Sequence, residues 1–308
     1  LQTDYGRLDR LGIFDTIDQH TDPGSELGKV DINWAVKERR TGQVSLGVGY
    51  SAREKLVGRA ELSETNFRGR GEGLNFLWET GAFTGKNSFQ LGYFKPWLDK
   101  RRTSMSVDLY DKLIYRFANS LGTTVTPTTV SSTTQYQERR AGGTLTFTRP
   151  LSEPFRLSLT GRFDDVTTSN VTNTLNTFPV QDGNVATGTV RGTLDTRDFA
   201  TNPTGGSYHT AWVEAGISNL RKSSITTDQL GTSPIAKLAG DLRRYIGLKR
   251  HKGKTLTDRS REKIPVLALR LMAGSSTGHL PFYEQFFVGG ADSLRGYLED
   301  RFWGRYMF

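Results

Sequence analysis

The side chains that could carry acid–base chemistry lie close together in the stretch Asp195-Thr196-Arg197-Asp198. Two carboxylates at this spacing could serve as a general acid and a general base. Acids in a turn also accept hydrogen bonds from backbone N–H groups, and an arginine between them can bridge the two carboxylates. We expect this second, structural role for Asp195, Arg197 and Asp198, and no catalysis.

Other reactive or metal-binding patterns are weak. The chain has no cysteine, which excludes disulfides, thiolate zinc sites and cysteine nucleophiles. Residues 69–73 are rich in glycine, but no helix follows to supply a phosphate-binding N-terminus, so a β-turn is expected. The histidines lie at no metal-ligand spacing, and they are His20, His209, His251 and His279. We therefore predict no metal and no cofactor.

The formal net charge is +9, which is compatible with nucleic acid or an anionic membrane surface as a partner. Most basic residues alternate with acids, and the densest basic run, residues 249–254, has no aromatic stacking partners. We interpret that run as a solvated turn between two strands and expect no nucleic-acid partner.

From residue 43 onward the chain alternates apolar with polar or small residues, which is the period of a β-strand. About eleven such segments are predicted, near 43–50, 55–63, 72–80, 86–95, 103–110, 136–148, 154–162, 186–195, 206–216, 235–246 and 264–273. No run reaches the roughly 18 to 20 apolar residues of a membrane-spanning helix. Most segments have the roughly 9 to 11 residues with which a tilted strand crosses a bilayer.

Long connections near 111–135, 163–185 and 217–234 largely alternate with short ones, as on the two sides of a membrane barrel. The basic connection near 247–263 breaks this rule. A soluble β-sandwich or a lipocalin-like barrel is the alternative. Aromatic residues near the strand ends favour the membrane barrel, and they are Tyr50, Trp78, Phe94, Trp97 and Tyr245.

Residues 1–41 differ from the rest of the chain. Leu1, Tyr5, Leu8 and Leu11 share one helical face that Gly12 can close, and residues 30–36 alternate as a strand. We interpret this segment as the end of a small α+β domain whose beginning precedes residue 1.

Four motifs occur in the order typical of one family. Residues 6–38 resemble the second half of a periplasmic POTRA repeat, and residues 42–71 are similar to the family's first barrel hairpin. Asp195, Arg197 and Asp198, with Pro203 and Gly206, resemble its D-x-R-D…P-x-x-G turn. Gly289-Gly290 followed by Leu294-Arg295-Gly296-Tyr297 resembles its arginine loop. The chain thus resembles the BamA and TamA superfamily of outer-membrane assembly proteins.

The resemblance implies an all-β fold, an incomplete antiparallel transmembrane barrel of about eleven to twelve of some sixteen strands, preceded by the end of an α+β POTRA domain. We expect the POTRA part over residues 1–41 and the barrel over 42–308. In the family the loop, here residues 274–305, folds back into the lumen. An arginine there needs a carboxylate or an aromatic face, which the resemblance places on a later strand than this chain contains. Gly296 would permit a sharp turn.

The implied function is folding and insertion of β-barrel proteins through a lateral seam at the first strand, whose interior glycines weaken it. The seam residues are Val44, Ser45, Leu46, Gly47, Val48, Gly49 and Tyr50. The implied partners are unfolded outer-membrane barrel proteins, outer-membrane lipids and accessory lipoproteins bound through POTRA domains. The implied location is the outer membrane of a Gram-negative bacterium or a derived organelle, with the POTRA side in the periplasm.

Two other functions remain open. A protein-translocating channel for two-partner secretion or plastid import would share the same barrel and loop. A lipase carrying this barrel as an anchor is the third possibility, and we expect any such activity to reside upstream of these residues.

Overall fold

The structure is a computed structural model that describes residues 12–26, 28–51, 55–81, 87–117, 135–170, 179–249, 264–297, 300 and 302–308. The predicted helix over residues 1–11 and most of the basic run at 249–254 lie outside the described residues. In the part of the chain that the structure describes, no helix has the length and apolar character needed to cross a membrane.

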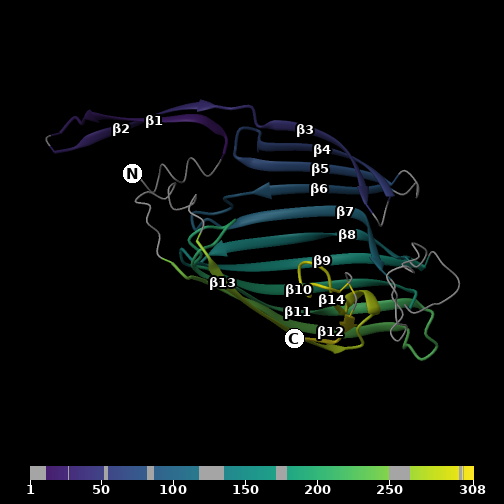
Figure 1. Ribbon diagram of the computed structural model, residues 1–308. Helices are drawn as coiled ribbons and strands as arrows, with labels where there is room; N and C mark the ends of the chain where they lie inside the picture. Colours follow the sequence, from purple (N-terminus) through teal and green to yellow (C-terminus); the bar gives the residue numbers. More distant parts are fainter. Residues whose placement is uncertain are drawn as a thin grey trace.

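One antiparallel sheet of twelve strands dominates the fold, and Figure 1 shows it as a curved wall running from β3 to β13. Its strands are β3 (Gly42–Ser51), β4 (Lys55–Phe67), β5 (Glu72–Gly81), β6 (Asn87–Lys95), β7 (Ser104–Phe117), β8 (Gln135–Pro150), β9 (Phe155–Asn170), β10 (Gln181–Asp195), β11 (Gly206–Ser223), β12 (Gly231–Gly247), β13 (Val266–Gly278) and β16 (Tyr306–Met307). All eleven predicted segments are strands. The twelfth, β16, returns to pair with β13 through Tyr306↔Ser275 and Met307↔Gly274.

The two faces of the sheet differ in polarity because each strand alternates. We define the inner face as the one against which residues 280–284 pack, and the outer face as its opposite. Outward side chains are apolar and exposed, for example Leu109, Phe163 and Leu271. Inward positions of the same strands carry charged or hydroxyl side chains, such as Asp108 and Arg162. An apolar outer face and a polar inner face are what a membrane barrel requires.

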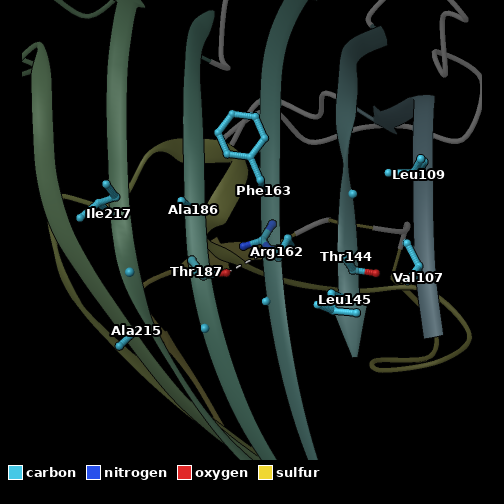
Figure 2. Close-up of a pocket in the computed structure, with 14 residues that line it drawn as sticks. Val107, Leu109, Thr144, Leu145, Arg162, Phe163, Ala186, Thr187, Ala215 and Ile217 are labelled. Carbon is cyan, nitrogen blue, oxygen red and sulfur yellow. Dashed lines mark hydrogen bonds between the residues drawn. The ribbon is translucent and has the colours of Figure 1, made fainter. Parts of the chain in front are cut away.

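Small residues hollow the sheet over β7 to β11. A shallow groove of about 620 Å³ lies there, lined by Gly143, Gly161 and Gly188 among others. Figure 2 shows the groove, with Leu109, Phe163 and Ile217 among the larger residues around it. Its apolar lining is consistent with contact to lipid chains rather than to water.

The strands on the long-connection side are longer than the alternation predicted. Strand β9 runs to Asn170 and β11 to Ser223, so residues 163–170 and 217–223 are strand rather than connection. These extensions are rich in Thr, Ser and Asn. Pairing with neighbouring strands satisfies the hydrogen bonds of their backbone N–H and C=O groups, so they need no continuous apolar face. Their sequences therefore show no alternation of apolar and polar residues.

A two-stranded hairpin precedes the sheet, formed by β1 (Phe14–Pro23) and β2 (Val30–Glu38). The predicted strand at 30–36 is confirmed, whereas β1 was not predicted, because its sequence carries few apolar residues. Gly12 has a φ of +64°, which suits a chain reversal before the hairpin. The hairpin ends at Glu38 and β3 begins at Gly42, next to the expected domain boundary. The assignment of residues 1–41 to a POTRA domain stays a prediction.

Candidate functional site

The chain between β13 and β16 folds back over the inner face of the sheet. It contains a short 3₁₀ helix, η2 (Phe282–Glu284), and a hairpin of β14 (Phe286–Val288) and β15 (Phe302–Gly304). In Figure 1 this segment lies in yellow in front of β10 to β12. The side chains of Leu280, Phe282, Tyr283 and Glu284 are all buried. The loop predicted over residues 274–305 begins later, because residues 274–278 belong to β13 and are held by its pairing with β12. That the loop lies in a barrel lumen stays a prediction.

The carboxylate of Glu284, which is 3% exposed, lies among three cationic side chains of the wall. Arg162 of β9 donates to both of its oxygens, at 3.0 and 2.9 Å. Arg140 of β8 donates to Oε1 at 3.0 Å, and Nζ of Lys237 of β12 lies 2.5 Å from Oε2. One carboxylate of the loop therefore joins three strands.

The same cations also bind carboxylates on the wall itself. Asp164 accepts from Arg140 at 3.1 Å and from Arg162 at 2.8 Å. Glu214 accepts from Arg162 at 3.0 Å. Arg140 also pairs with the neighbouring Glu138. The wall alone thus places three cations against three anions, and Glu284 brings the fourth anion. Buried ions of this kind are tolerated only where charges are paired and hydrogen-bonded.

The loop backbone is bound to the wall as well. Nη2 of Arg140 donates to the Tyr283 carbonyl at 2.7 Å, and the Phe282 N–H donates to Oε1 of Gln181 at 2.6 Å. Gly183 leaves the space that the Tyr283 ring occupies, since a Cβ there would lie 2.7 Å from the Tyr283 hydroxyl. An apolar cluster accompanies these bonds, formed by Val166, Val185, Ile235, Leu280 and Tyr283.

The aromatic residues of the loop join η2 to its hairpin. The ring of Phe282 meets the rings of Phe287 and Trp303 edge-on, at centroid distances of 5.3 and 5.8 Å. Such pairs are the favoured geometry of aromatic rings. The hairpin is therefore packed against the buried segment through these three rings.

The predicted motif forms the tip of this hairpin. Gly289, Gly290 and Gly296 have φ values of +143°, +82° and +91°, which side-chain-bearing residues rarely adopt. The Gly290 N–H donates to the Tyr297 carbonyl at 3.1 Å, which closes the tip, and Leu294 accepts from the Tyr297 N–H at 3.4 Å. Arg270 of β13 donates to the Asp292 carbonyl and also binds Asp241 of β12, which ties the tip to the sheet.

Arg295 lies on the exposed side of this tip, where its Nε lies 3.5 Å from the Ala291 carbonyl. Leu294 and Tyr297 are also exposed. The prediction that Arg295 pairs with a carboxylate inside a lumen stays a prediction. The charged loop residue that does enter the wall is Glu284, which the sequence analysis missed. The sequence pattern that could have indicated Glu284 is an acidic residue among the aromatic residues of 282–287, within a loop expected to fold inward.

The turn between β10 and β11 contains the predicted motif residues, whose structural role stays a prediction. Arg197 binds the carboxylate of Asp195 with two hydrogen bonds, of 2.9 and 2.8 Å. Asp198 accepts from the backbone N–H groups of Phe199 at 2.9 Å and Gly205 at 3.1 Å, and from Thr204. Pro203 is half-buried and directly precedes Thr204, one of the donors to Asp198. The carboxylate oxygens of Asp195 and Asp198 thus accept hydrogen bonds from backbone amides, from Arg197 and from the Thr204 hydroxyl.

Gly206 closes this turn with a φ of +94°, and a Cβ on it would lie 2.2 Å from the Thr196 carbonyl oxygen. Burial opposes ionisation of Asp198, but the hydrogen bonds from Thr204 and the backbone amides outweigh it and lower the pKa of Asp198. The turn is therefore an ordered support for β10 and β11.

The predicted seam strand is one edge of the sheet. Among the described residues, β3 pairs only with β4, through Val44↔Leu62 to Tyr50↔Leu56. Its outward side chains are between 67% and 79% exposed, and they are Val44, Leu46, Val48 and Tyr50. Ser45, Gly47 and Gly49 alternate with them and face inward, and a Cβ at Gly47 or Gly49 would meet nothing within 4 Å.

No metal site is visible in the described ranges, where no group of three or more His, Asp and Glu side chains is placed to hold an ion. The charged side chains around Glu284 are paired with one another.

The site holds the loop against one half of the sheet, and the edge strand β3 lies at the other end.

The inserted loop, the polar inner face and the apolar outer face define an outer-membrane β-barrel protein. Residues 66–305 match the model of the Omp85 superfamily domain, so the chain belongs to this superfamily. It is 25% identical, over 96% of its length, to the outer membrane protein assembly factor BamA of Neisseria meningitidis, of which it covers 35%. It is 24% identical to the BamA of Nitratidesulfovibrio vulgaris, with 94% of this chain and 32% of that protein covered.

The solved structures agree on the fold. BamA from Haemophilus ducreyi lacking POTRA domains 1–3 superimposes with a TM-score of 0.63 and 19% identity, over 96% of this chain and 53% of that one. CdiB from Escherichia coli does so with a TM-score of 0.54 and 13% identity, over 93% and 50%. The chain thus spans about a third of the curated relatives and half of the solved structures, and it is an outer-membrane protein.

Proposed function

We propose that this chain is part of an assembly factor that folds and inserts β-barrel proteins into the outer membrane through a lateral seam at β3. The observation that carries the proposal is the position of β3 at the sheet edge, with its apolar residues pointing outward. The inward glycines, Gly47 and Gly49, leave the strand without side-chain packing on its other face.

An edge strand of this kind has a physical reason to accept a partner. Its unpaired N–H and C=O groups have no water to bond in lipid, and each unsatisfied group costs several kcal/mol. An incoming strand that pairs with β3 by β-augmentation satisfies them. Folding of the substrate supplies the free energy, so no nucleotide is needed and no catalytic activity is proposed.

The proposed partners follow from this chemistry and from the relatives' names. They are unfolded outer-membrane β-barrel proteins at the seam and outer-membrane lipids around the outer face. Accessory lipoproteins are proposed to bind through POTRA domains on the periplasmic side. The BamA relatives, described as assembly factors, support the first of these.

The absence of cysteine allows a direct test. Ser45→Cys is introduced on β3 of the full-length protein, and a stalled barrel substrate carries one cysteine at successive positions of its last strand. We expect a disulfide at one register and at every second position around it, because side chains on a strand alternate between faces.

Ser63→Cys is the matched control, because Ser63 faces inward one strand away, on β4, where β3 and β5 already occupy both edges. We expect it to form no substrate disulfide. Equal crosslinking from both positions, or from Ser45 only to the protein's own last strand, would contradict the seam.

A protein-translocating channel of the same superfamily is the second candidate. The observation that favours it is the inner face, which carries charged and hydroxyl side chains such as Asp108, Thr146 and Arg162. Substrate-gated conductance in a planar bilayer, without the β3 crosslink, would support the channel.

A further inference from the structure

We propose that Glu284 is the residue that keeps the inward-folded loop docked, acting as an ionic latch between the loop and β8, β9 and β12. The inference holds for either proposed function, because it concerns the position of the loop and not the identity of the substrate. It assigns the anchoring of residues 279–305 to a side chain outside the Leu294-Arg295-Gly296-Tyr297 motif.

The first argument is the geometry of the carboxylate. Both oxygens of Glu284 are used: Oε1 accepts from Arg140 and Arg162, and Oε2 from Arg162 and Lys237. Charge-assisted bonds of this kind are the strongest available to a side chain, and the two from Arg162 also fix its orientation. Within the described part of the chain, no other side chain of residues 279–297 forms an ion pair with the wall.

The second argument concerns the charges of the wall. Without Glu284, the cations Arg140, Arg162 and Lys237 face Glu138, Asp164 and Glu214, all on strands. Lys112 and Asp108 of β7 line the same 370 Å³ cavity as Arg140 and Arg162, and they add one charge of each sign. The wall charges therefore balance without Glu284. Its carboxylate is held by the hydrogen bonds from three cations and not by an excess of positive charge.

The third argument is that a neighbouring contact of the loop shares its wall partner, Arg140, with Glu284. Arg140, which Glu284 holds, donates to the Tyr283 carbonyl next to it. Tyr283 and Leu280 then cover Val185 of β10, which is completely buried. Loss of the latch should therefore uncover Val185 while the strands of the sheet stay paired.

The test uses the thiol of a Val185→Cys variant, which differs little in volume and is the chain's only cysteine. In the full-length protein in lipid vesicles, a water-soluble, membrane-impermeant thiol reagent should react slowly with it while the loop is docked. In Glu284→Gln we expect labelling to be roughly 10- to 100-fold faster, which corresponds to losing hydrogen bonds to charged groups. A cooperative unfolding transition of the same sample shows that each variant is folded.

Glu214→Gln is the matched control, because it removes the same charge from the same cluster but from a strand. Glu79→Gln is the second control, because Glu79 faces inward on β5 and forms its ion pair with Arg59, away from the cluster. We expect neither to accelerate labelling at position 185 by more than about twofold. Equal acceleration by Glu214→Gln would overturn the proposal, since any disturbance of the cluster would then open the loop.

Glu284→Asp keeps the test decisive if Glu284→Gln does not fold. This variant retains the charge and shortens the side chain by one methylene, so it cannot reach all three cations. We expect an intermediate labelling rate in a folded protein. Wild-type protection of position 185 in a folded Glu284→Asp or Glu284→Gln protein would overturn the latch.

Discussion

The guanidinium of Arg162 holds the carboxylate of Glu284 with two hydrogen bonds, of 2.9 and 3.0 Å, across 122 positions of the sequence. A planar guanidinium fork matches a carboxylate in one relative orientation only. The pair therefore fixes both the depth and the direction in which the loop enters the sheet.

The charges around Glu284 should act as a coupled unit. Lys237→Gln and Glu284→Gln each leave a buried partner short of its counter-charge, whereas the double variant removes both charges together. We expect the double variant to lose less unfolding free energy than the two single variants lose in sum, by about 1 to 3 kcal/mol. Denaturant unfolding in detergent micelles at neutral pH measures all four proteins. For Lys237 and Glu79, which lie on β12 and β5, we expect additive losses, and a coupling there would discredit the measurement.

The turn glycine should be irreplaceable for a steric reason. Gly206→Ala places a Cβ 2.2 Å from the Thr196 carbonyl oxygen at a φ of +94°, and we expect a loss of at least about 2 kcal/mol in unfolding free energy. Gly205→Ala is the control one residue earlier, where the nearest atom to the new Cβ lies at an ordinary 3.8 Å. Similar losses for the two variants would argue against the turn geometry.

Acid should remove the contribution of Asp198. Its pKa in the folded protein is lowered, because hydrogen bonds from Thr204 and backbone amides outweigh burial. A carboxyl with a lowered folded pKa stabilises the fold fully above its unfolded pKa of about 4, and loses this as the pH falls through the lower value. The stability difference between wild type and Asp198→Asn should therefore be largest at pH 7 and shrink below pH 4. A difference that grows on acidification would contradict the assignment.

The seam glycines should trade stability against function. Gly47→Ala and Gly49→Ala meet no neighbouring atom, so each should raise strand stability by roughly 0.5 to 1 kcal/mol. On the proposed mechanism the stiffer edge should insert substrate barrels more slowly, as followed by the appearance of folded substrate in vesicles. Gly188→Ala provides the comparison, since it also meets open space but lies in the middle of the sheet, on β10. If Gly188→Ala slowed substrate insertion as well, the slowing could not be assigned to the seam.

Arg295 should matter for function more than for stability. Because its side chain is exposed, Arg295→Ala should change the unfolding free energy by no more than about 0.5 kcal/mol. On the proposed function the same variant, as the only copy in the cell, should impair growth by loosening the loop. Normal growth would count heavily against a role for the motif.

The eleven strands from β3 to β13 were predictable because each of them carries its own signal. Alternation such as Val44, Leu46, Val48 against Ser45, Gly47 reports a strand with one apolar face, whatever its neighbours are. The ends of β9 and β11 and the strand β1 were not predictable in this way, because their pairing rests on backbone bonds that leave no apolar rhythm. Strand β16, with two residues, is too short to carry a period.

The Glu284 cluster illustrates the other limit. Its partners Arg140, Arg162 and Lys237 lie 144, 122 and 47 positions away, and only the register of the sheet brings them together. Each is an ordinary charged residue on the polar face of its strand. The sequence could indicate that they point inward, but not that they converge on one carboxylate.

The docked loop also divides the mechanics of the sheet. The hydrogen bonds and ion pairs described above tie it to β8, β9, β10, β12 and β13, which lie in the half of the sheet away from β3 to β6. The loop therefore braces one half of the curved wall. The proposed seam strand, β3, lies in the other half, where bending of the sheet is opposed by strand pairing and not by the loop.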